Sequence, residues 1–398
     1  MKPLILQDGL TPLIITRTAP KAVFLIFNNH HTPRSGKKKT IYEKQSLKKE
    51  TNAMSDKQKQ RLGQFYTRQN TWLTTPVLDF IQKNLPPNTI VLDPFAGEGH
   101  LLKTIQTHFP HQPLNFAGLD INPELKQWPT NDSLSHLPLN QKDKYFFITN
   151  PPYLSKVSCK RKKYMTIYQK YFAKKPWQDL YLIALHKMIA TNQPGVAIVP
   201  ETFINNTTFN KDQINRIIII EDNPFNDTEI PICVVCFNGS PTEKQIIYKN
   251  NQKVGPLSVL EKLKPTLSQP LLKDLQFNNF RGPIALKAID YKNPSARILF
   301  LPTTQLNYDL SQIKHSSRAI TVLHSAVFAL LNPTQLKQLI QDANDILNEF
   351  RQKTQDVLLS PFKGNNNHNQ RRRRLDFTLA RNIIEKAYLL QSERKEKI

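Results

Sequence analysis

Short apolar runs that are typical of buried strands alternate with helical patterns between about residue 56 and residue 240. Strands that alternate with helices favour a mostly parallel, doubly wound sheet, so this alternation constrains the fold more than any other feature. We therefore predict an α/β protein. The predicted strands are residues 89–93, 115–120, 145–149, 195–199, 216–220 and 230–237, the last two like a hairpin, and helices are predicted to begin near Gly99 and to cover residues 177–190.

The chain is strongly basic, with a formal net charge of +24 over 398 residues. A basic excess of that size favours a polyanionic partner, most commonly nucleic acid, although a basic protein without such a partner stays open as an alternative. The three cysteines are too few for a disulfide framework, which favours a reducing cytoplasm. No apolar run reaches the roughly 20 residues that a membrane helix needs, so no membrane association is expected.

Cys233 and Cys236 form a lone C-x-x-C within an apolar run. A zinc site would need further cysteine or histidine ligands nearby, and the sequence offers none. We therefore expect a buried strand at this position and no metal site.

Three segments follow one another along the chain. Residues 1–55 are a basic, poorly patterned leader, which is either a nucleic-acid-contacting arm, or disordered, or upstream of the true start. Residues 56–240 hold the predicted sheet. Residues 241–398 are punctuated by prolines and contain helices predicted over 336–350 and 375–390 with a basic loop between them, which predicts a separate, smaller domain.

A glycine-containing turn, Asp93-Pro94-Phe95-Ala96-Gly97-Glu98-Gly99-His100, follows the first predicted strand directly and opens a helix. Glycines permit positive φ and close approach of a ligand, and the amides at a helix start suit a polar or anionic group. Asp120 closes the next strand, where an acid can accept hydrogen bonds from two ribose hydroxyls. The turn and this acid together predict a site for a nucleoside-bearing cofactor.

A second segment, Asn150-Pro151-Pro152-Tyr153, comes directly after the strand predicted over residues 145–149. A proline-rich turn is the plain alternative, but ligands of such sheets bind at the carboxyl ends of the strands. The side-chain carbonyl of Asn150 and the main-chain carbonyl of Pro151 can both accept from one amino group. Proline lacks an N–H and keeps the loop rigid, and Tyr153 can offer its ring to a flat base.

With these motifs in place, residues 61–240 resemble the catalytic domain of amino-group DNA methyltransferases of the adenine-N6 type. The order, with cofactor motifs first, the catalytic motif second and a recognition region last, is the gamma arrangement that is common in bacterial restriction–modification systems. The matching segments are Gly63-Gln64-Phe65-Tyr66-Thr67, Asp93 to Gly99, Asp120, Asp132 and Asn150 to Tyr153.

The resemblance implies a Rossmann-like sheet, S-adenosyl-L-methionine as the cofactor, and a smaller C-terminal DNA-recognition domain over residues 241–398. It implies that Asp132 accepts from the adenine amino group of the cofactor. The implied catalytic residues are Asn150, Pro151, Pro152 and Tyr153. The implied cofactor-binding residues are Thr67, Asp93, Pro94, Phe95, Ala96, Gly97, Gly99, Asp120, Ile121 and Asp132.

A base inside a duplex must be flipped into such a pocket, so the DNA backbone needs to be held nearby. Phe225 is expected either to stack on the flipped base or to be a core residue. The basic residues expected to contact DNA, with a solvated loop as the alternative for the first group, are Lys156, Lys160, Arg161, Lys162 and Lys163, and more weakly Arg371, Arg372, Arg373 and Arg374.

The resemblance leaves rival functions open. Methyltransferases of glutamine in release factors and some RNA enzymes also use Asn-Pro-Pro-Tyr, and a DNA-binding module with an inactive core is a further alternative. The expected setting is a monomeric, bacterial cytoplasmic enzyme that acts on double-stranded DNA. A restriction endonuclease that shares its target site is a candidate functional partner.

Overall fold

The computed structural model describes residues 70–225, 228–314 and 316–396. The leader expected at residues 1–55 and the motif that contains Thr67 lie outside the described residues. The chain divides into two compact units. Among the described residues, unit 1 is residues 85–193, and unit 2 is residues 70–84 with 194–396. This division falls within residues 56–240, and the domain boundaries expected from the sequence stay predictions.

Unit 1 is built on three parallel strands in the order β2-β1-β3. The chain passes from β1 through α3 to β2 and then returns to the other side of β1 to form β3, so the strand order reverses between β1 and β3. Crevices at such switch points are where α/β sheets bind ligands. The elements of unit 1 are β1 (Ile90–Asp93), α3 (His100–His108), β2 (Asn115–Gly118), β3 (Tyr145–Thr149), α4 (Lys156–Arg161), α5 (Met165–Tyr171) and α6 (Leu180–Ile189).

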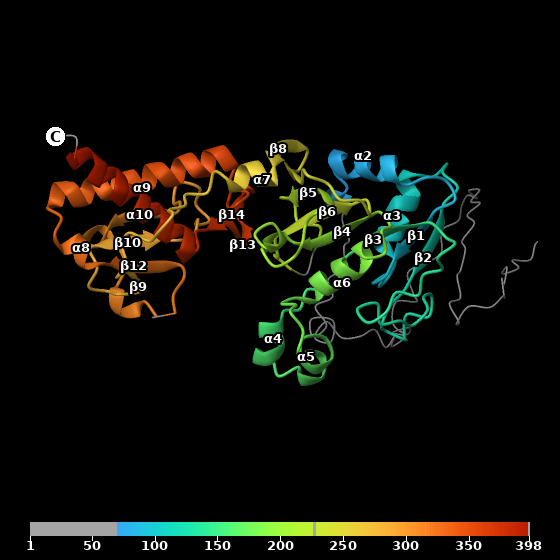
Figure 1. The fold of residues 1–398 in the computed structure, drawn as a ribbon. Helices are drawn as coiled ribbons and strands as arrows, with labels where there is room; N and C mark the ends of the chain where they lie inside the picture. The colour runs from blue at the N-terminus through green and yellow to red at the C-terminus, as the bar shows by residue number, and fades with distance from the viewer. Residues whose placement is uncertain (1–69, 226–227, 315, 397–398) are drawn as a thin grey trace, which may run out of the picture. The chain divides into compact units, whose positions relative to one another are not determined.

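The local sequence explains these elements. All five residues of β3 are buried, as a continuous apolar run in a parallel sheet requires. Helix α3 buries Leu101, Leu102 and Ile105 and packs against β1 and β3. Figure 1 shows α4 and α5 as a pair of short helices at the lower edge of the view. The strands predicted over residues 89–93, 115–120 and 145–149 are confirmed.

The first sheet of unit 2 has the order β4-β6-β5-β7-β8. β5 and β6 pair in antiparallel fashion, which confirms the expected hairpin-like pairing, and β5 pairs with β7 in parallel. Its strands are β4 (Gly195–Pro200), β5 (Ile214–Ile220), β6 (Ile232–Phe237), β7 (Ile246–Lys249) and β8 (Gln252–Pro256), flanked by η1 (Asn70–Trp72), α2 (Thr75–Asn84), η2 (Glu201–Phe203) and α7 (Leu257–Glu261).

Cys233 and Cys236 both lie in β6 and are buried with free thiols, which confirms the strand expected there. Residues three apart in a strand point to opposite faces of the sheet. The two sulfur atoms therefore cannot approach one metal ion from this strand. Burial raises the pKa of the Cys236 thiol well above its usual range.

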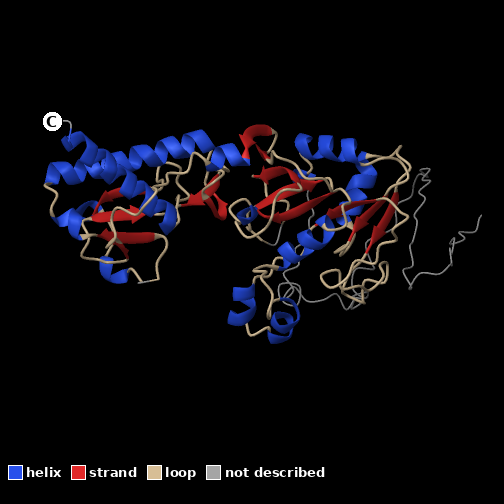
Figure 2. Ribbon diagram, viewed as in Figure 1, coloured by secondary structure: helices blue, strands red, loops and turns tan. Residues whose placement is uncertain are grey.

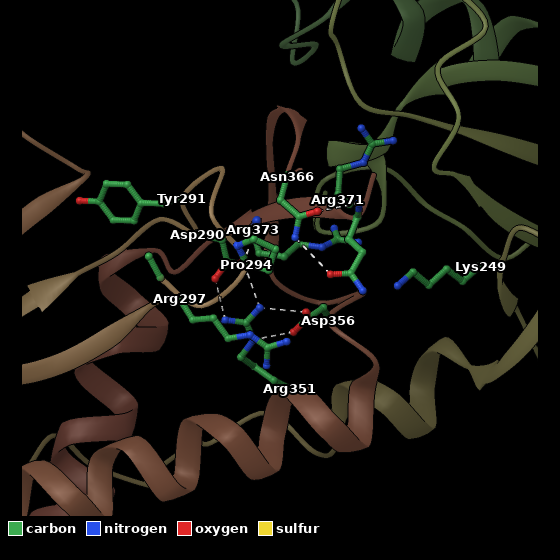
Figure 3. A pocket seen from close by; sticks show the side chains of 12 residues that line it. Lys249, Asp290, Tyr291, Pro294, Arg297, Arg351, Asp356, Asn366, Arg371 and Arg373 are labelled. Carbon is green, nitrogen blue, oxygen red and sulfur yellow. Dashed lines mark hydrogen bonds and ion pairs between the residues drawn. The ribbon is translucent and has the colours of Figure 1, made fainter. Parts of the chain in front are cut away.

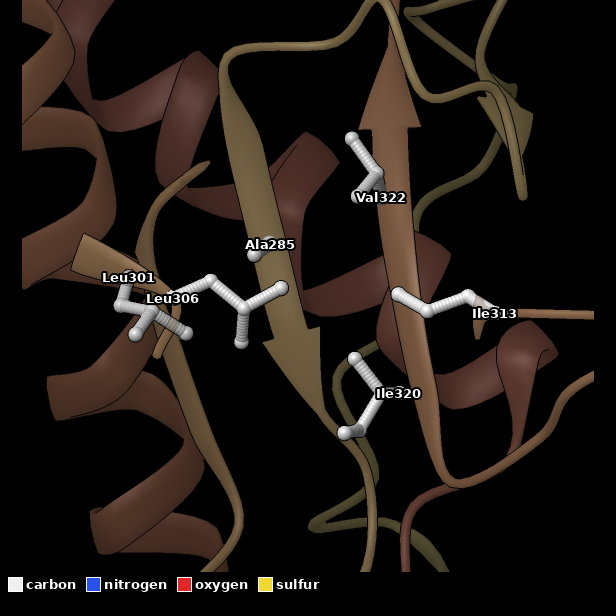
Figure 4. Packing of buried hydrophobic residues seen from close by; sticks show 6 residues of the cluster. All are labelled: Ala285, Leu301, Leu306, Ile313, Ile320 and Val322. Carbon is white, nitrogen blue, oxygen red and sulfur yellow. The ribbon is translucent and has the colours of Figure 1, made fainter. Parts of the chain in front are cut away.

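The C-terminal part of unit 2 contains a four-stranded antiparallel sheet, β11-β10-β12-β9, beside two long helices (Figure 2). Ala285, Val322 and Leu301 belong to the apolar cluster on this sheet (Figure 4). The elements are β9 (Gln276–Phe277), β10 (Ile284–Lys287), β11 (Leu299–Pro302), η3 (Thr303–Gln305), η4 (Leu310–Gln312), β12 (Ile320–His324), α8 (Ala326–Ala329), α9 (Pro333–Thr354), β13 (Ser360–Asn365), β14 (Arg371–Arg374) and α10 (Phe377–Glu396).

Helix α9 has sequence signals at both ends. Asn332 and Gln335 form a reciprocal capping box, and Pro333 occupies the first helical position. The helix ends at Thr354, and the C-cap residue Gln355 has a left-handed φ of 48°. The helices predicted over residues 336–350 and 375–390 are confirmed, and both are longer than predicted. Across the described residues, no helix has the length and hydropathy that crossing a membrane requires.

Candidate active site

A buried hydrogen bond ties together the carboxyl ends of β1 and β3. Thr149 Oγ1 donates to Asp93 Oδ1 at 2.6 Å, and the Phe95 backbone N–H donates to the same oxygen at 3.0 Å. Asp93 is 1% exposed. Burial raises the pKa of Asp93 to about 7, while the two hydrogen bonds act in the opposite direction. This carboxyl therefore anchors the glycine turn against the strand that precedes Asn150.

Two glycines give the turn its shape. Gly97 and Gly99 have φ values of 50° and 78°, a region that L side chains rarely adopt. Ala96 N donates to Leu119 O and Leu119 N donates to Asp93 O, both at 2.9 Å, so the turn is fastened to the residue that follows β2. These contacts bring the turn and Asp120 together, as the sequence predicted for a cofactor site.

The Gly97 peptide is held from both sides. Its N–H donates to Asp120 Oδ2 at 2.9 Å, and its carbonyl accepts from Trp128 Nε1 at 2.8 Å. The Gly97 amide, occupied in this way, orients Asp120 instead of pointing at a ligand. The peptide's orientation depends on an acid and an indole that come from one segment, residues 120–128.

Trp128 is a residue that the sequence analysis missed. A Cβ added at Gly99 would lie 2.8 Å from Trp128 Cζ2, and one at Gly118 would lie 2.6 Å from Trp128 Cδ2 and Cε3. Both distances are shorter than real Cβ contacts allow. The indole fits only because both positions are glycine. The available signal was a glycine after the end of β1, Gly99, and another at the end of β2, Gly118, with a tryptophan ten residues after the second.

Asp120 fits the ribose-binding role that the resemblance implies. Its Oδ1 accepts from Asn122 N at 2.8 Å and its Oδ2 accepts from Gly97 N. A carboxylate has about four acceptor positions, so two further hydroxyl groups can still donate to it. Burial raises the pKa of Asp120, whereas its backbone hydrogen bonds lower it. The next residue, Ile121, is 42% exposed and leaves an apolar side chain accessible beside Asp120.

Asp132 is joined to α5. Its Oδ2 lies 2.6 Å from Lys170 Nζ and accepts from Tyr171 Oη at 3.0 Å and from Ser135 Oγ at 2.5 Å. Burial raises the pKa of Asp132, but the hydrogen bonds from Lys170, Ser135 and Tyr171 outweigh it, so the pKa is lowered overall. Oδ1 accepts from Leu134 N at 3.2 Å and keeps capacity for one further donor.

The Asn150-Pro151-Pro152-Tyr153 loop begins where β3 ends. Pro151 is buried, whereas Asn150, Pro152 and Tyr153 are half-buried. The Tyr153 ring contacts Tyr181 of α6 edge to face, with centroids 6.4 Å apart and planes at 83°. The loop thus starts one residue beyond the Thr149 hydroxyl that binds Asp93, which places its backbone beside the turn.

The basic segment after Tyr153 forms α4 and the turn that follows it. Lys156 is half-buried, and the other four predicted contacts are exposed. Lys160 Nζ lies 5.2 Å from the Tyr168 ring centroid and Lys162 Nζ lies 5.8 Å from that of Tyr164. The four exposed residues are Lys160, Arg161, Lys162 and Lys163. Exposed cations beside tyrosine rings are suited to bind phosphate and base together.

The expectation of a basic loop at residues 371–374 is corrected, because these residues form β14 and pair with β13. Arg371 and Arg373 are 6% and 1% exposed and both contact Glu201, so neither is available at the surface. Arg372 donates to Asp290 O at 2.8 Å and lies over the Phe362 ring. Arg374 is half-buried.

A cavity of about 100 Å³ adjoins this hairpin, and both acidic and basic side chains line it. Figure 3 shows Arg351 between Asp290 and Asp356, to which it is joined at 2.9 and 2.8 Å. These ion pairs occupy donors of the Arg351 guanidinium, and all residues that line the cavity belong to unit 2. Phe225 is also in unit 2 and is 5% exposed, as the core alternative requires.

No protein-family model matches this sequence, and no curated protein matches it significantly. Among similar solved structures is a Listeria monocytogenes protein assigned to the class I S-adenosylmethionine-dependent methyltransferases, with 14% identity over 46% of this chain and 65% of that chain, and a TM-score of 0.33. A type I restriction–modification methyltransferase subunit from Streptococcus thermophilus has 17% identity over 50% of this chain and 51% of that chain, with a TM-score of 0.35.

TrmN from Thermus thermophilus has 16% identity over 41% of this chain and 48% of that chain, with a TM-score of 0.27. This chain therefore spans between about half and 65% of the length of these neighbours. Similarities with TM-scores this low do not indicate a function, so the function is inferred from the geometry of the site.

Proposed function

We propose that this chain transfers a methyl group from S-adenosyl-L-methionine to the N6 amino group of adenine in double-stranded DNA. The observation that carries the proposal is the hydrogen bond from Thr149 to Asp93. It ties the start of the Asn150–Tyr153 loop to the start of the glycine turn, at the switch point of the unit 1 sheet. A group bound by the turn would thereby lie beside a group bound by the loop.

The cofactor side of the site would use three side chains. Asp120 would accept from the two ribose hydroxyls, Ile121 would pack on the adenine ring, and Asp132 would accept from the adenine amino group through Oδ1. When bound, S-adenosyl-L-methionine supplies an electrophilic methyl group on a sulfonium. The raised pKa of Asp120 agrees with a carboxyl that is desolvated before its partner arrives.

The target side would use Asn150 and Pro151. Their carbonyl oxygens would accept the two amino hydrogens of adenine and turn the nitrogen lone pair toward the methyl group. This is catalysis by orientation and by electrostatic stabilisation of the positive charge that develops on nitrogen. Tyr153 would stack on the flipped base, which offsets part of the few kcal/mol that flipping costs.

Helices α4 and α5 would hold the DNA backbone. Their exposed lysines lie over tyrosine rings, a combination that suits a phosphate chain with an unstacked base next to it. Because lysine contacts with phosphate release counterions, DNA affinity should fall as the salt concentration rises. Arg372 and Arg374 are further candidates for such contacts.

The experiment is transfer of a tritiated methyl group to three acceptors: duplex DNA, structured RNA and a peptide release factor. We expect label in DNA alone, recovered as N6-methyldeoxyadenosine after digestion. Label in RNA or in the release factor would replace the proposal by one of its two enzymatic rivals. Binding of S-adenosyl-L-methionine without transfer to any acceptor would favour the inactive DNA-binding module.

A further inference from the structure

A short antiparallel ladder follows Tyr153 directly. Leu180 N donates to Leu154 O at 3.1 Å, Lys156 N donates to Gln178 O at 2.8 Å, and Ser155 lies opposite Asp179. Residues 154–156 therefore run alongside residues 178–180, just before α6 begins. The ladder fixes where the side chains around Tyr153 lie.

The ladder has a core side and an open side. Leu154 and Leu180 are buried, at 3% exposure each, and they mark the core side. Side chains alternate along extended backbone, and directly opposed residues project to the same side. Ser155 and Asp179 therefore share the open side, where both are half-buried. Tyr153 precedes Ser155 by two residues, and its ring contacts Tyr181, which follows Asp179 by two residues. The Asp179 carboxylate therefore lies close along the chain to the ring pair that Tyr153 forms.

The Asp179 carboxylate is unusual in its surroundings. Asp179 is the N-cap residue of α6, yet its side chain accepts no hydrogen bond from the helix. An aspartate at this position ordinarily accepts from the N–H of the second or third helical residue. Among the described residues, no hydrogen bond or ion pair to this carboxylate is found, and Lys156 directs its Nζ to Lys175 O at 3.4 Å.

Burial raises the pKa of Asp179 to about 6, and burial is the sole cause. The titratable groups on the segments around it are Tyr153, Tyr181 and Lys156, and none of them contributes to the shift. A desolvated acid that receives no compensating contact costs stability. Groups of this kind concentrate at functional sites, because their acidity is matched to neutral pH.

We propose that Asp179 is the proton acceptor of the methyl transfer; this inference rests on the proposed function. The adenine nitrogen gains the methyl group as the carbon–sulfur bond of the donor breaks, and the sulfonium becomes a neutral thioether. As positive charge develops on the nitrogen in this step, one of its protons passes to the Asp179 carboxylate, directly or through one water molecule, and from there to solvent.

The proton needs an acceptor that the loop itself does not supply. Asn150 and Pro151 offer amide carbonyl oxygens, which bind the amino hydrogens but are far too weakly basic to keep a proton. A carboxylate that is ionised at neutral pH and titrates close to it can both take up and release one, and a general base acts within hydrogen-bond reach or through one water. Asp179 supplies this group on the open side of the ladder.

The test is the single-turnover rate of DNA methylation for Asp179→Asn, for Asp179→Glu and for the control Asp212→Asn, which removes the same charge from an exposed aspartate of unit 2. We expect Asp179→Asn to lower the rate by about 100-fold, the lower end for loss of a general base, with unchanged affinities for DNA and cofactor. Asp179→Glu should recover part of the rate, and Asp212→Asn should keep it. The wild-type rate should fall as the pH is lowered through 6, and the Asp179→Asn rate should not.

A second readout does not require activity. Carbon-13 NMR of aspartate side chains in the free chain should show a carboxyl that titrates near pH 6 and that disappears in Asp179→Asn. An Asp179→Asn rate within threefold of wild type, or a loss confined to DNA affinity, or the lack of that titration, would overturn the assignment. If wild type methylates no acceptor at all, the proposed function fails instead, and the two failures are distinguished.

Discussion

Thr149 Oγ1 lies 2.6 Å from Asp93 Oδ1, and this contact joins the carboxyl ends of β3 and β1 inside the core of unit 1. Both residues are 1% exposed. One sits at the start of the turn assigned to the cofactor and the other sits just before the loop assigned to the target base. The relative position of the two loops depends on this pair.

Replacing Thr149 by valine removes the hydroxyl and keeps the shape of the side chain. We expect the free energy of unfolding to fall by ~1–3 kcal/mol, because a buried carboxyl loses a hydrogen-bond donor. Urea unfolding measures the change. Thr107→Val is the control, since its hydroxyl donates to Lys103 O on an exposed helix face. Equal effects at the two positions would contradict the role given to Thr149.

The stability of the chain should depend on pH through Asp93, whose pKa is raised from 3.8 to about 7. Between these values the folded chain holds a proton that the unfolded chain has released. The free energy of unfolding therefore falls as the pH rises through this window, by on the order of 4 kcal/mol when complete.

Asp93→Asn should flatten this dependence while Oδ1 still accepts from Thr149 and Phe95. Urea unfolding between pH 5 and pH 8 measures how steeply the free energy of unfolding changes with pH. It is measured for the variant and for Glu124→Gln, which alters an exposed acid in the same unit. We expect the control to keep the wild-type slope. A wild-type slope in Asp93→Asn would mean that this carboxyl is not the group that titrates.

Gly118→Ala should be poorly tolerated, because the new Cβ would lie 2.6 Å from the Trp128 ring and 2.7 Å from Ala96 Cβ. Overpacking of this kind costs ~1–3 kcal/mol. In a Trp128→Ala background the same change should cost less, because the indole is gone. Thermal unfolding of the two single variants and of the double variant gives the coupling free energy between positions 118 and 128. If the two stability changes simply add, the contact is ruled out.

Glu201→Gln should destabilise unit 2 strongly. Glu201 Oε2 lies 3.2 Å from Arg371 Nε and its Oε1 contacts Arg373 Nη1, so the variant leaves two buried guanidinium groups without their counter-charge. Breaking a buried pair costs ~3–5 kcal/mol. Glu349→Gln, at the exposed pair with Lys353, should change nothing measurable. Similar urea midpoints for the two variants would contradict the buried ion-pair assignment.

The strands of unit 1 could be predicted because buried strands of a parallel sheet appear in the sequence as short, continuous apolar runs. Residues 145–149 form an unbroken run of buried side chains, and the predicted bounds match β3. The turn from Asp93 to Gly99 is readable because glycine at positive φ is a local requirement. The acid and the turn also had to meet, since parallel neighbouring strands end at the same edge.

The rest depended on partners far along the chain. Arg371 and Arg373 are buried by Glu201, which is 172 residues from Arg373, and four identical residues hide the alternation that marks a strand. Trp128 lies in a polar segment without a period, and only the fold shows that it covers Gly99 and Gly118. Asp179 falls inside the helix predicted over residues 177–190, and only the structure shows that it is an N-cap residue whose side chain makes no cap hydrogen bond.

The most direct test of the central claim compares wild type with Asn150→Ala on duplex DNA and labelled S-adenosyl-L-methionine, followed by digestion to nucleosides. We expect wild type to yield labelled N6-methyldeoxyadenosine and Asn150→Ala to lose at least about 100-fold in rate, as removal of a group that stabilises developing charge does. Cofactor affinity by calorimetry should be unchanged in the variant. Labelled N6-methyldeoxyadenosine formed by Asn150→Ala at the wild-type rate would contradict the claim.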